Sequence, residues 1–224
     1  MLREANVKAA LEIDGYALLR EYCPSVPSLP AFEDLGEIDT LEGLATIQHL
    51  TPKEVSDASP NTYSGNFGTS CFPLHTDLAH WARPPRYLAL RCIRGSADVA
   101  TRLQDGKLLI AEIGVEALRM ALVQSRRPMH NGRQLLRILE RVDKVDVLRI
   151  RWDSIYLRSA TSTAQEVLDR IAFYLKRVQT VDVFLQQPGD TLLIDHWRVL
   201  HGRSATTRDA SSRHIDRVYM GFIR

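Results

Sequence analysis

The chain has 224 residues, with 29 Lys and Arg against 27 Asp and Glu, a formal net charge of +2 and 45% hydrophobic residues. This balance gives no sign of a nucleic-acid partner, and the length fits one domain, which we expect to span residues 1–224. The sequence contains no run of about 18 apolar residues and no signal-peptide core, so we expect a cytoplasmic protein without a membrane partner.

The three cysteines, Cys23, Cys71 and Cys92, are widely separated and include no C-x-x-C pair. A disulfide framework or a zinc cluster built from cysteines is therefore not indicated. We expect reduced, mostly structural thiols, in keeping with the cytoplasm.

The first half of the chain is expected to begin with a helix, followed by a short buried strand at residues 15–20 that a glycine turn introduces. Pro84 and Pro85 cannot continue a ladder of hydrogen bonds, and residues 87–93 form the next clear strand. Apolar residues recur at roughly helical spacing over residues 108–124, which predicts a helix there.

The second half alternates in a way that predicts strands at residues 147–152, 181–185 and 216–223, with a turn at Gly189-Asp190. Residues 163–178 form an amphipathic pattern, and Thr163 with Glu166 fits a capping box at the start of a helix. A strand-rich chain interrupted by two helices predicts a mainly β fold with flanking helices, namely a double-stranded β-helix or jelly roll.

One short motif, His75-Thr76-Asp77, places an imidazole and a carboxylate two residues apart. On an extended strand such side chains share a face, so they can converge on one ion. With seven His and sixteen Asp, random placement gives about half an H-x-D pair in this chain, and a second one, at His214 and Asp216, does exist. Alone, therefore, either pair is best interpreted as a surface histidine near an acid.

His201 supplies the missing partner, in a segment that starts at Pro188-Gly189-Asp190 and runs through apolar residues to Gly202-Arg203. Two imidazoles and one carboxylate occupy one face of a non-haem Fe(II) ion and leave the other positions open. His75, Asp77 and His201 are therefore the candidate catalytic metal ligands. His80 and His196 compete with them, although His196 lies an odd number of residues from His201 and would face away on a straight strand.

The stretch HTDLAHWARPPRYLALRCI at 75–93 and the stretch PGDTLLIDHWRVLHGR at 188–203 resemble the TauD/TfdA family of Fe(II)- and 2-oxoglutarate-dependent dioxygenases, which includes taurine dioxygenase-like and clavaminate synthase-like enzymes. The resemblance runs from about Asn66 to Phe222. In that family an H-x-D precedes a loop ending in Pro-Pro, a P-G-D turn leads into the strand of the distal His, and an Arg follows about a dozen positions later.

The resemblance implies that His75, Asp77 and His201 hold Fe(II) and that Arg213 binds the distal carboxylate of 2-oxoglutarate, for which a guanidinium fork is suited. Arg217 shares the face of Arg213 on a strand, so it is expected to assist there or to hold an anionic group of the substrate. The same alternation turns His214 and Asp216 to the opposite face and disfavours them as ligands of this metal.

The family also uses a Thr beyond the Pro-Pro strand to bind the co-substrate, and Thr101 is the matching choice, although the family's paired glycines are missing here. Tyr63, Asn66 and Trp81 flank the first ligands and are candidates to line the substrate pocket, with packing as the alternative. A basic stretch, interpreted as a solvated face rather than a nucleic-acid site, contains Arg126, Arg127, His130, Arg133, Arg137 and Arg141.

The expected function is hydroxylation of an unactivated carbon in a small polar or anionic molecule, such as an amino acid or a natural-product intermediate, with dioxygen consumed and succinate and CO2 released. Because Asp77 is retained, halogenation is disfavoured, while desaturation and ring closure stay open. The alternatives are a jelly-roll protein that keeps the metal and senses or carries a ligand without turnover, and a β-domain that binds RNA or protein through the basic stretch. Neither the substrate nor the oligomeric state follows from the sequence.

Overall fold

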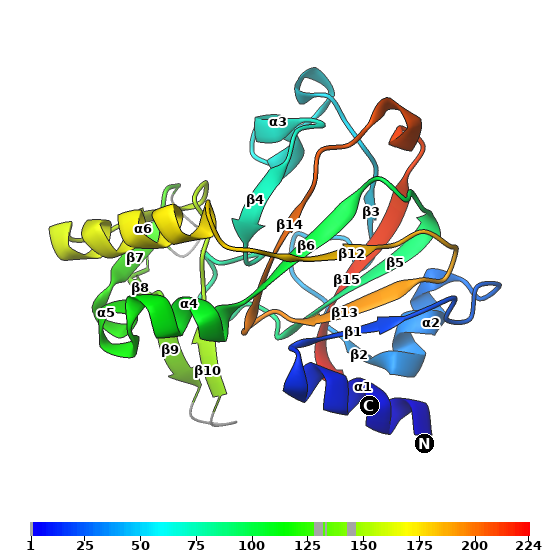
Figure 1. The fold of residues 1–224 in the computed structure, drawn as a ribbon, viewed down its shortest axis with the longest axis horizontal. Helices are drawn as coiled ribbons and strands as arrows, with labels where there is room; N and C mark the ends of the chain where they lie inside the picture. The colour runs from blue at the N-terminus through cyan, green and yellow to red at the C-terminus, as the bar shows by residue number, and fades with distance from the viewer. Residues whose placement is uncertain (1, 128–131, 133, 143–146) are drawn as a thin grey trace.

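The computed structural model describes residues 2–127, 132, 134–142 and 147–224. Two antiparallel sheets form the larger part of the molecule (Figure 1). The larger sheet has the order β1-β13-β5-β15-β2, with β3 also pairing with β15; its strands are β1 (Tyr16–Leu19), β2 (Gly36–Ile38), β3 (Gln48–Leu50), β5 (Tyr87–Arg94), β13 (Thr191–Asp195) and β15 (His214–Ile223). The smaller has the order β12-β6-β14-β4; its strands are β4 (Phe72–His75), β6 (Ala100–Asp105), β12 (Val181–Phe184) and β14 (Val199–Arg203).

Both faces of the larger sheet are buried. On β13, Leu192 and Ile194 pack into the space between the two sheets, where they meet Leu103 of the smaller sheet. Leu193, between them in sequence, points to the other face and packs under helices α1 (Leu2–Ile13) and α2 (Ser28–Leu35). The period-2 alternation of strand side chains thus builds two cores from one strand, and the expected mainly β jelly roll with flanking helices is confirmed.

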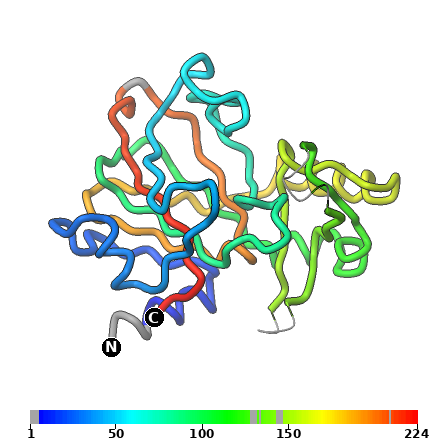
Figure 2. Tube along the Cα trace, turned by 180° about the vertical axis from the view of Figure 1, so that it is seen from behind, coloured from blue at the N-terminus to red at the C-terminus, as the bar shows by residue number. Residues whose placement is uncertain are grey.

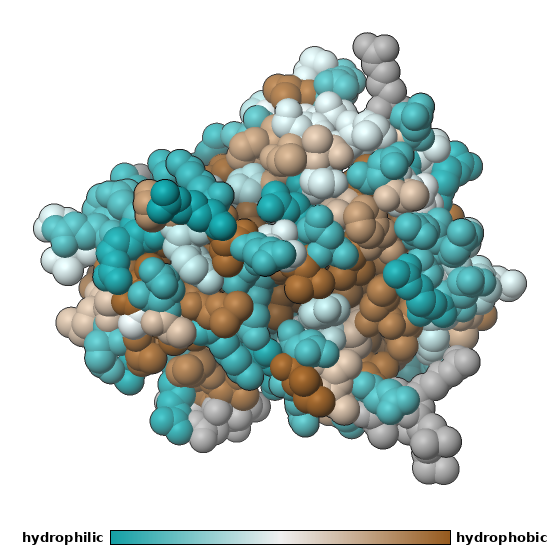
Figure 3. Space-filling model, in the orientation of Figure 1, coloured by the Kyte–Doolittle hydropathy of each residue, from teal (hydrophilic) through white to brown (hydrophobic). Residues whose placement is uncertain are grey.

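A second lobe lies beside the sandwich (Figures 1 and 2). It has its own apolar core, and its largest helix is α6 (Ser162–Leu175), which buries one stripe of side chains and leaves the other in solvent. Figure 3 shows mostly hydrophilic residues where the exposed face of α6 lies. The lobe also contains α4 (Gly106–Ile113), α5 (Val115–Met120), β7 (Leu122–Ser125), β8 (Leu136–Arg137), β9 (Leu139–Val142), β10 (Val147–Ile150) and β11 (Leu157–Ser159).

The helix expected over residues 108–124 is wrong in its extent. The segment forms α4 and α5, which are separated by Gly114 at a φ of 97°, a conformation that favours glycine. The last residues of the predicted helix belong to β7, which pairs with β8 and β11. Long-range strand pairing therefore overrides the local helical periodicity.

The expected capping box of the later helix is also wrong, by two residues. Helix α6 begins at Ser162, and its N-cap is Thr161, whose hydroxyl accepts a hydrogen bond from the amide of Ala164. Three consecutive hydroxyl residues, 161–163, each suit an N-cap, and local sequence does not distinguish them. The other expected elements, namely the opening helix and the five strands, are present with small shifts of their ends.

Gly202 lets two strands of the smaller sheet approach closely. A Cβ atom at this position would lie 2.7 Å from the carbonyl oxygen of Phe72 on β4. We therefore expect Gly202→Ala to destabilise the metal-free protein by about 1–3 kcal/mol, the usual cost of overpacking. Chemical denaturation measures this, with the exposed neighbour Ser70→Ala as the control. A loss no larger than that of the control would contradict the close approach.

Candidate metal centre

Two neighbouring strands of the smaller sheet bring the candidate histidines together. His75 is the last residue of β4, and His201 lies in the middle of β14 as its direct partner across the ladder. Asp77 follows β4 in a turn in which Leu78 has a positive φ of 54°. The strand therefore ends before the carboxylate, and it is this turn, rather than a straight strand, that directs Asp77 back toward the histidines.

The metal-binding atoms of His75, Asp77 and His201 all lie within 4.8 Å of one another, and all three residues are buried. Nε2 of His75 is 3.2 Å from Oδ1 of Asp77, and Nε2 of His201 is 3.7 Å from the same oxygen. The three residues that the sequence predicted as ligands are thus brought to one point. The side chain of Thr76 points away from them, with its hydroxyl near the main chain of Trp152.

The tautomer of His75 follows from its second nitrogen. Nδ1 lies 2.8 Å from the carbonyl oxygen of Pro73, which only accepts, so Nδ1 carries the proton. When Nδ1 carries the only ring proton, Nε2 directs its lone pair at an oxygen of Asp77. Two acceptors facing each other at 3.2 Å repel, and a cation between them removes the repulsion. The donor set therefore fits a metal ion, and its two imidazoles with one carboxylate are those of a non-haem Fe(II) site.

Two side chains of the larger sheet donate hydrogen bonds to the second oxygen of Asp77, Oδ2. Arg217 and Tyr219, which share a face of β15, donate to Oδ2 over 2.8 and 2.9 Å. Burial raises the pKa of Asp77, but the nearby Arg217, His201 and His75 together outweigh burial and hold the pKa well below its usual range. Burial also lowers the pKa of His201 well below its usual value. The site consequently presents an ionised carboxylate and a neutral imidazole, the forms that bind metal.

His196 belongs to the support of the site. Its Nε2 accepts a hydrogen bond from the main-chain amide of Asp77, so this nitrogen is not free to bind a metal. The expectation that it faces away along one straight strand with His201 is wrong, because a turn separates β13 from β14 and the two strands belong to different sheets. The turn at Pro188-Gly189-Asp190 therefore leads into β13, whereas His201 lies on the next strand, β14.

Burial lowers the pKa of His196 to about 4. A histidine kept neutral in the folded state favours folding above its unfolded pKa of about 6.5 and loses that contribution as the pH falls toward 4. We expect the free energy of unfolding of the metal-free protein to fall by about 2 kcal/mol from this group between pH 7 and pH 5. Denaturation of wild type and His196→Gln at both pH values isolates the effect, since only the wild type should show it. Identical pH profiles would contradict the assignment.

Tyr63, an expected substrate contact, packs on the metal centre. Its ring stacks on that of His75, with the centroids 3.9 Å apart, and its hydroxyl donates to Asp153. The sequence analysis did not single out Asp153, which also accepts the amides of Ile155 and Tyr156. The only local signal is a carboxylate shortly after a strand, at a turn, which is too common to identify a site.

A cavity of about 820 Å³ opens over the three candidate ligands. Arg213 lines it and is buried, and its Nε has no hydrogen-bond partner in the described part of the chain. Burial lowers the pKa of this guanidinium to about 10, so it stays charged near neutral pH. A buried and unsatisfied guanidinium is costly, and a carboxylate ligand would satisfy it. Thr101 is also buried and lines the same cavity.

The other predicted contacts lie around this cavity. Trp81 is part of its wall, and Asn66 lies at its exposed edge, where its amide donates to the carbonyls of Pro60 and Thr62. Besides Asp77, Arg217 contacts Gln48, whose Oε1 accepts from its Nε at 3.2 Å. Its guanidinium is thus occupied by protein groups, while that of Arg213 is free to meet a ligand.

The remaining candidate residues are His80 and the basic stretch. His80 lines the cavity but is not among the three converging ligands. Arg126 and Arg127 are exposed and border the cavity, whereas Arg137 donates to the carbonyl of Arg119 in the second lobe. His130 and Arg133 lie outside the described residues. In the described part of the chain, no helix is both long and apolar enough to cross a membrane.

No family model matches the chain. Among curated proteins it is similar to an L-lysine 3-hydroxylase of Catenulispora acidiphila, 28% identical over 196 residues. The match covers 78% of this chain and 51% of the relative, so the chain spans about half the length of that protein.

Solved structures share the fold at lower identity. Asparagine oxygenase, in complex with Fe(II), a 3-hydroxyasparagine and succinate, superposes with a TM-score of 0.71 at 18% identity, over 98% of this chain and 79% of the other. PvcB of Pseudomonas aeruginosa, described as an Fe, α-ketoglutarate-dependent oxygenase, gives 0.67 at 20% identity, over 97% and 79%. The non-haem iron oxygenase OrfP, with Fe, succinate and (3S)-hydroxy-L-Arg, gives 0.65 at 18% identity, over 98% and 78%.

Proposed function

From the premise that the chain has the fold of TauD/TfdA-type Fe(II)/2-oxoglutarate-dependent oxygenases, we propose that it hydroxylates an unactivated carbon of a free amino acid. The observation that carries the proposal is the convergence of His75, Asp77 and His201 beside a buried, unpartnered Arg213 in one cavity. The named substrates and products of the relatives, lysine, hydroxyasparagine and hydroxyarginine, support an amino acid as the substrate class.

Each of the residues at the candidate centre has a separate role. His75, Asp77 and His201 hold Fe(II), and Arg213 pairs with the distal carboxylate of 2-oxoglutarate, for which the hydroxyl of Thr101 is a second donor. Bound Fe(II), with 2-oxoglutarate and dioxygen, supplies the oxidant that removes hydrogen from the substrate, and the co-substrate leaves as succinate and CO2. Arg217, for which 2-oxoglutarate or the substrate was predicted as the partner, orients the Asp77 carboxylate instead.

The cavity edge favours a substrate that carries a carboxylate. Lys53, Arg126 and Arg127 are exposed and border the cavity, while the carboxylates that line it, Asp77 and Asp153, are already bound by other protein groups. The positive edge therefore attracts the α-carboxylate of an amino acid. Tyr63 keeps His75 in place by stacking, and Trp81 with Asn66 completes the wall of the cavity.

The free thiols of Cys23, Cys71 and Cys92 suit the reducing cytoplasm, where we place the protein.

The test is aerobic turnover of the Fe(II)-loaded protein with 2-oxoglutarate and each of the common L-amino acids. We expect succinate formation to rise with at least one of them, together with a product heavier by one oxygen atom. Asp182→Asn, which changes an exposed carboxylate on β12, serves as the control and should turn over like the wild type. Succinate at the no-enzyme background with every amino acid would contradict the proposal and would favour a metal-binding sensor or carrier. Retention on RNA that falls steeply with salt would favour a β-domain that binds RNA through the basic stretch.

A further inference from the structure

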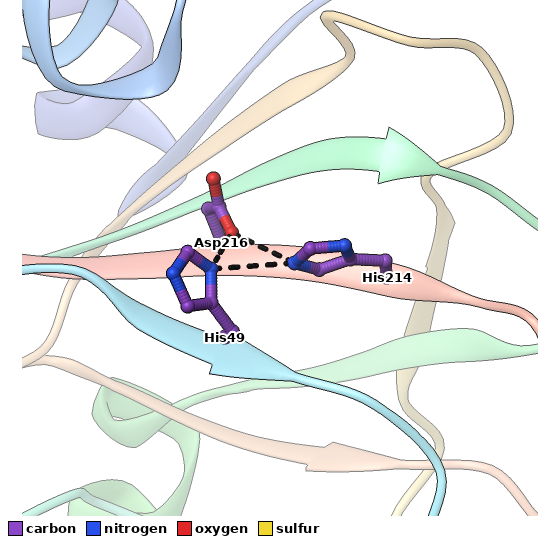
Figure 4. A group of neighbouring side chains, drawn as sticks. All are labelled: His49, His214 and Asp216. Carbon is purple, nitrogen blue, oxygen red and sulfur yellow. Dashed lines mark hydrogen bonds and ion pairs between the residues drawn. The ribbon is translucent and has the colours of Figure 1, made fainter.

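A second group of two histidines and one aspartate lies on the other face of β15 (Figure 4). The H-x-D pair of His214 and Asp216, which alternation turns away from the first centre, acquires a third member that no sequence pattern indicated. That residue is His49 of β3, the direct partner of Asp216 across the ladder. The chain thus brings together three potential metal ligands from segments about 165 residues apart.

The three ligand atoms form a compact triangle. Nδ1 of His49 is 2.6 Å and Nε2 of His214 is 3.1 Å from the same oxygen, Oδ1 of Asp216. The two nitrogens are 3.3 Å apart. In a tetrahedral site with bonds of about 2.0–2.1 Å, neighbouring ligand atoms are separated by about 3.3 Å. An ion just outside the plane of this triangle therefore reaches all three atoms with little movement.

One oxygen of the Asp216 carboxylate is available to bind a metal ion. Asp216 is buried, and its Oδ2 accepts a hydrogen bond from Ser28 at the start of α2, which leaves Oδ1 to the histidines. Arg91, its neighbour on β5, donates instead to main-chain carbonyls and to the hydroxyl of Thr191. Among the described residues, Asp216 pairs with histidines alone, whereas Asp77 is also paired with an arginine.

The histidines leave one side of the triangle open to solvent. The side chain of His49 is 63% exposed and that of His214 is 34% exposed, so water can complete the coordination of an ion. Without an ion, the two ring nitrogens share one carboxylate oxygen, Oδ1 of Asp216, while they lie 3.3 Å apart. A single divalent cation can accept a lone pair from each of the three atoms at once.

We propose that His49, His214 and Asp216 form a second metal site, distinct from the iron centre, for a divalent transition-metal ion of the Zn²⁺ type. Imidazole nitrogens suit zinc, and one carboxylate with water completes a four-coordinate site. The ion links β3, a three-residue edge strand, to β15. Thr51, Pro52 and Lys53, directly after β3, belong to the cavity wall, so the ion also anchors the start of that wall.

The test uses Zn²⁺ itself, with the iron site disabled by His75→Ala and His201→Ala. We expect this double variant to bind one zinc ion per chain in equilibrium titration. Adding His49→Gln or His214→Gln should weaken that binding at least tenfold, since each removes one of three ligands. Asp182→Asn is the control, because it changes an exposed carboxylate on β12 that belongs to neither group of ligands, and it should leave zinc binding unchanged.

Crystals of the wild type grown with zinc give a second measurement that does not depend on the folding of the variants. Anomalous scattering at the zinc edge should show a peak between His49, His214 and Asp216. A double variant that binds no zinc, titrations that His49→Gln does not alter, or a peak at the His75 centre alone would overturn the proposal. None of these results affects the iron centre, whose failure would appear instead as absent Fe(II) binding with zinc still held at the second site.

Discussion

Replacing Arg213 by alanine is expected to weaken the binding of 2-oxoglutarate to the Fe(II)-loaded protein by about 100-fold. A bidentate pair between a guanidinium and a carboxylate has two charge-assisted hydrogen bonds, each worth about 1.5–3 kcal/mol, and about 3 kcal/mol corresponds to a factor of this size. The effect is large here because Arg213 is buried and its Nε has no hydrogen-bond partner among the residues that the structure describes. Anaerobic titration with 2-oxoglutarate gives the dissociation constant directly.

Two further variants make the Arg213 test specific. Arg213→Lys keeps the charge but not the planar fork, so it should recover only part of the affinity. Arg94→Ala removes an exposed arginine from β5 of the same sheet and should leave the affinity unchanged. A dissociation constant for Arg213→Ala within about threefold of the wild type would mean that the co-substrate carboxylate binds elsewhere.

Replacing Arg217 by methionine is expected to lower the affinity for Fe(II) by about 10–100-fold, the usual cost of losing an outer partner of a metal ligand. The guanidinium donates to Oδ2 of Asp77 and holds the carboxylate with Oδ1 toward the histidines. Its positive charge also keeps Asp77 ionised, so both the orientation and the charge of the ligand depend on it. Competition with a coloured Fe(II) chelator measures the affinity.

Tyr219→Phe is the matched comparison for Arg217. It removes the other hydrogen bond to Oδ2 but leaves the charge of Arg217 in place, so the affinity for Fe(II) should fall by less. If both variants bound Fe(II) as tightly as the wild type, Asp77 would not depend on β15 for its position. A change in the affinity for 2-oxoglutarate with unchanged Fe(II) binding would instead support the original expectation that Arg217 binds the co-substrate.

The candidate metal ligands were predictable because their pattern is local or tied to a resemblance. His75 and Asp77 are two residues apart, His201 lies in a stretch that resembles the TauD/TfdA family, and the structure brings the three together. The resemblance itself is confirmed at the level of the fold. The mainly β fold was equally predictable, because the alternation of apolar residues at 147–152 and 181–185 is a property of the local sequence.

The supports of the site were not predictable because they depend on contacts between distant segments. Tyr219 and Asp153 reach the centre only once the two sheets and the second lobe are in place, and neither lies in a distinctive motif. The role of His49 likewise appears only when β3 pairs with β15. The helix over residues 108–124 failed for the same reason, because the pairing of β7 with β8 and β11 lies outside any local window.

The visible spectrum of the protein with Fe(II) and 2-oxoglutarate under anaerobic conditions tests whether the three candidate ligands hold iron. If His75, Asp77 and His201 gather around one ferrous ion, the wild type gives the weak charge-transfer band of an iron-bound 2-oxoglutarate chelate, and His75→Ala gives none. An unchanged band in His75→Ala, with the variant folded, would contradict the assignment of the metal centre.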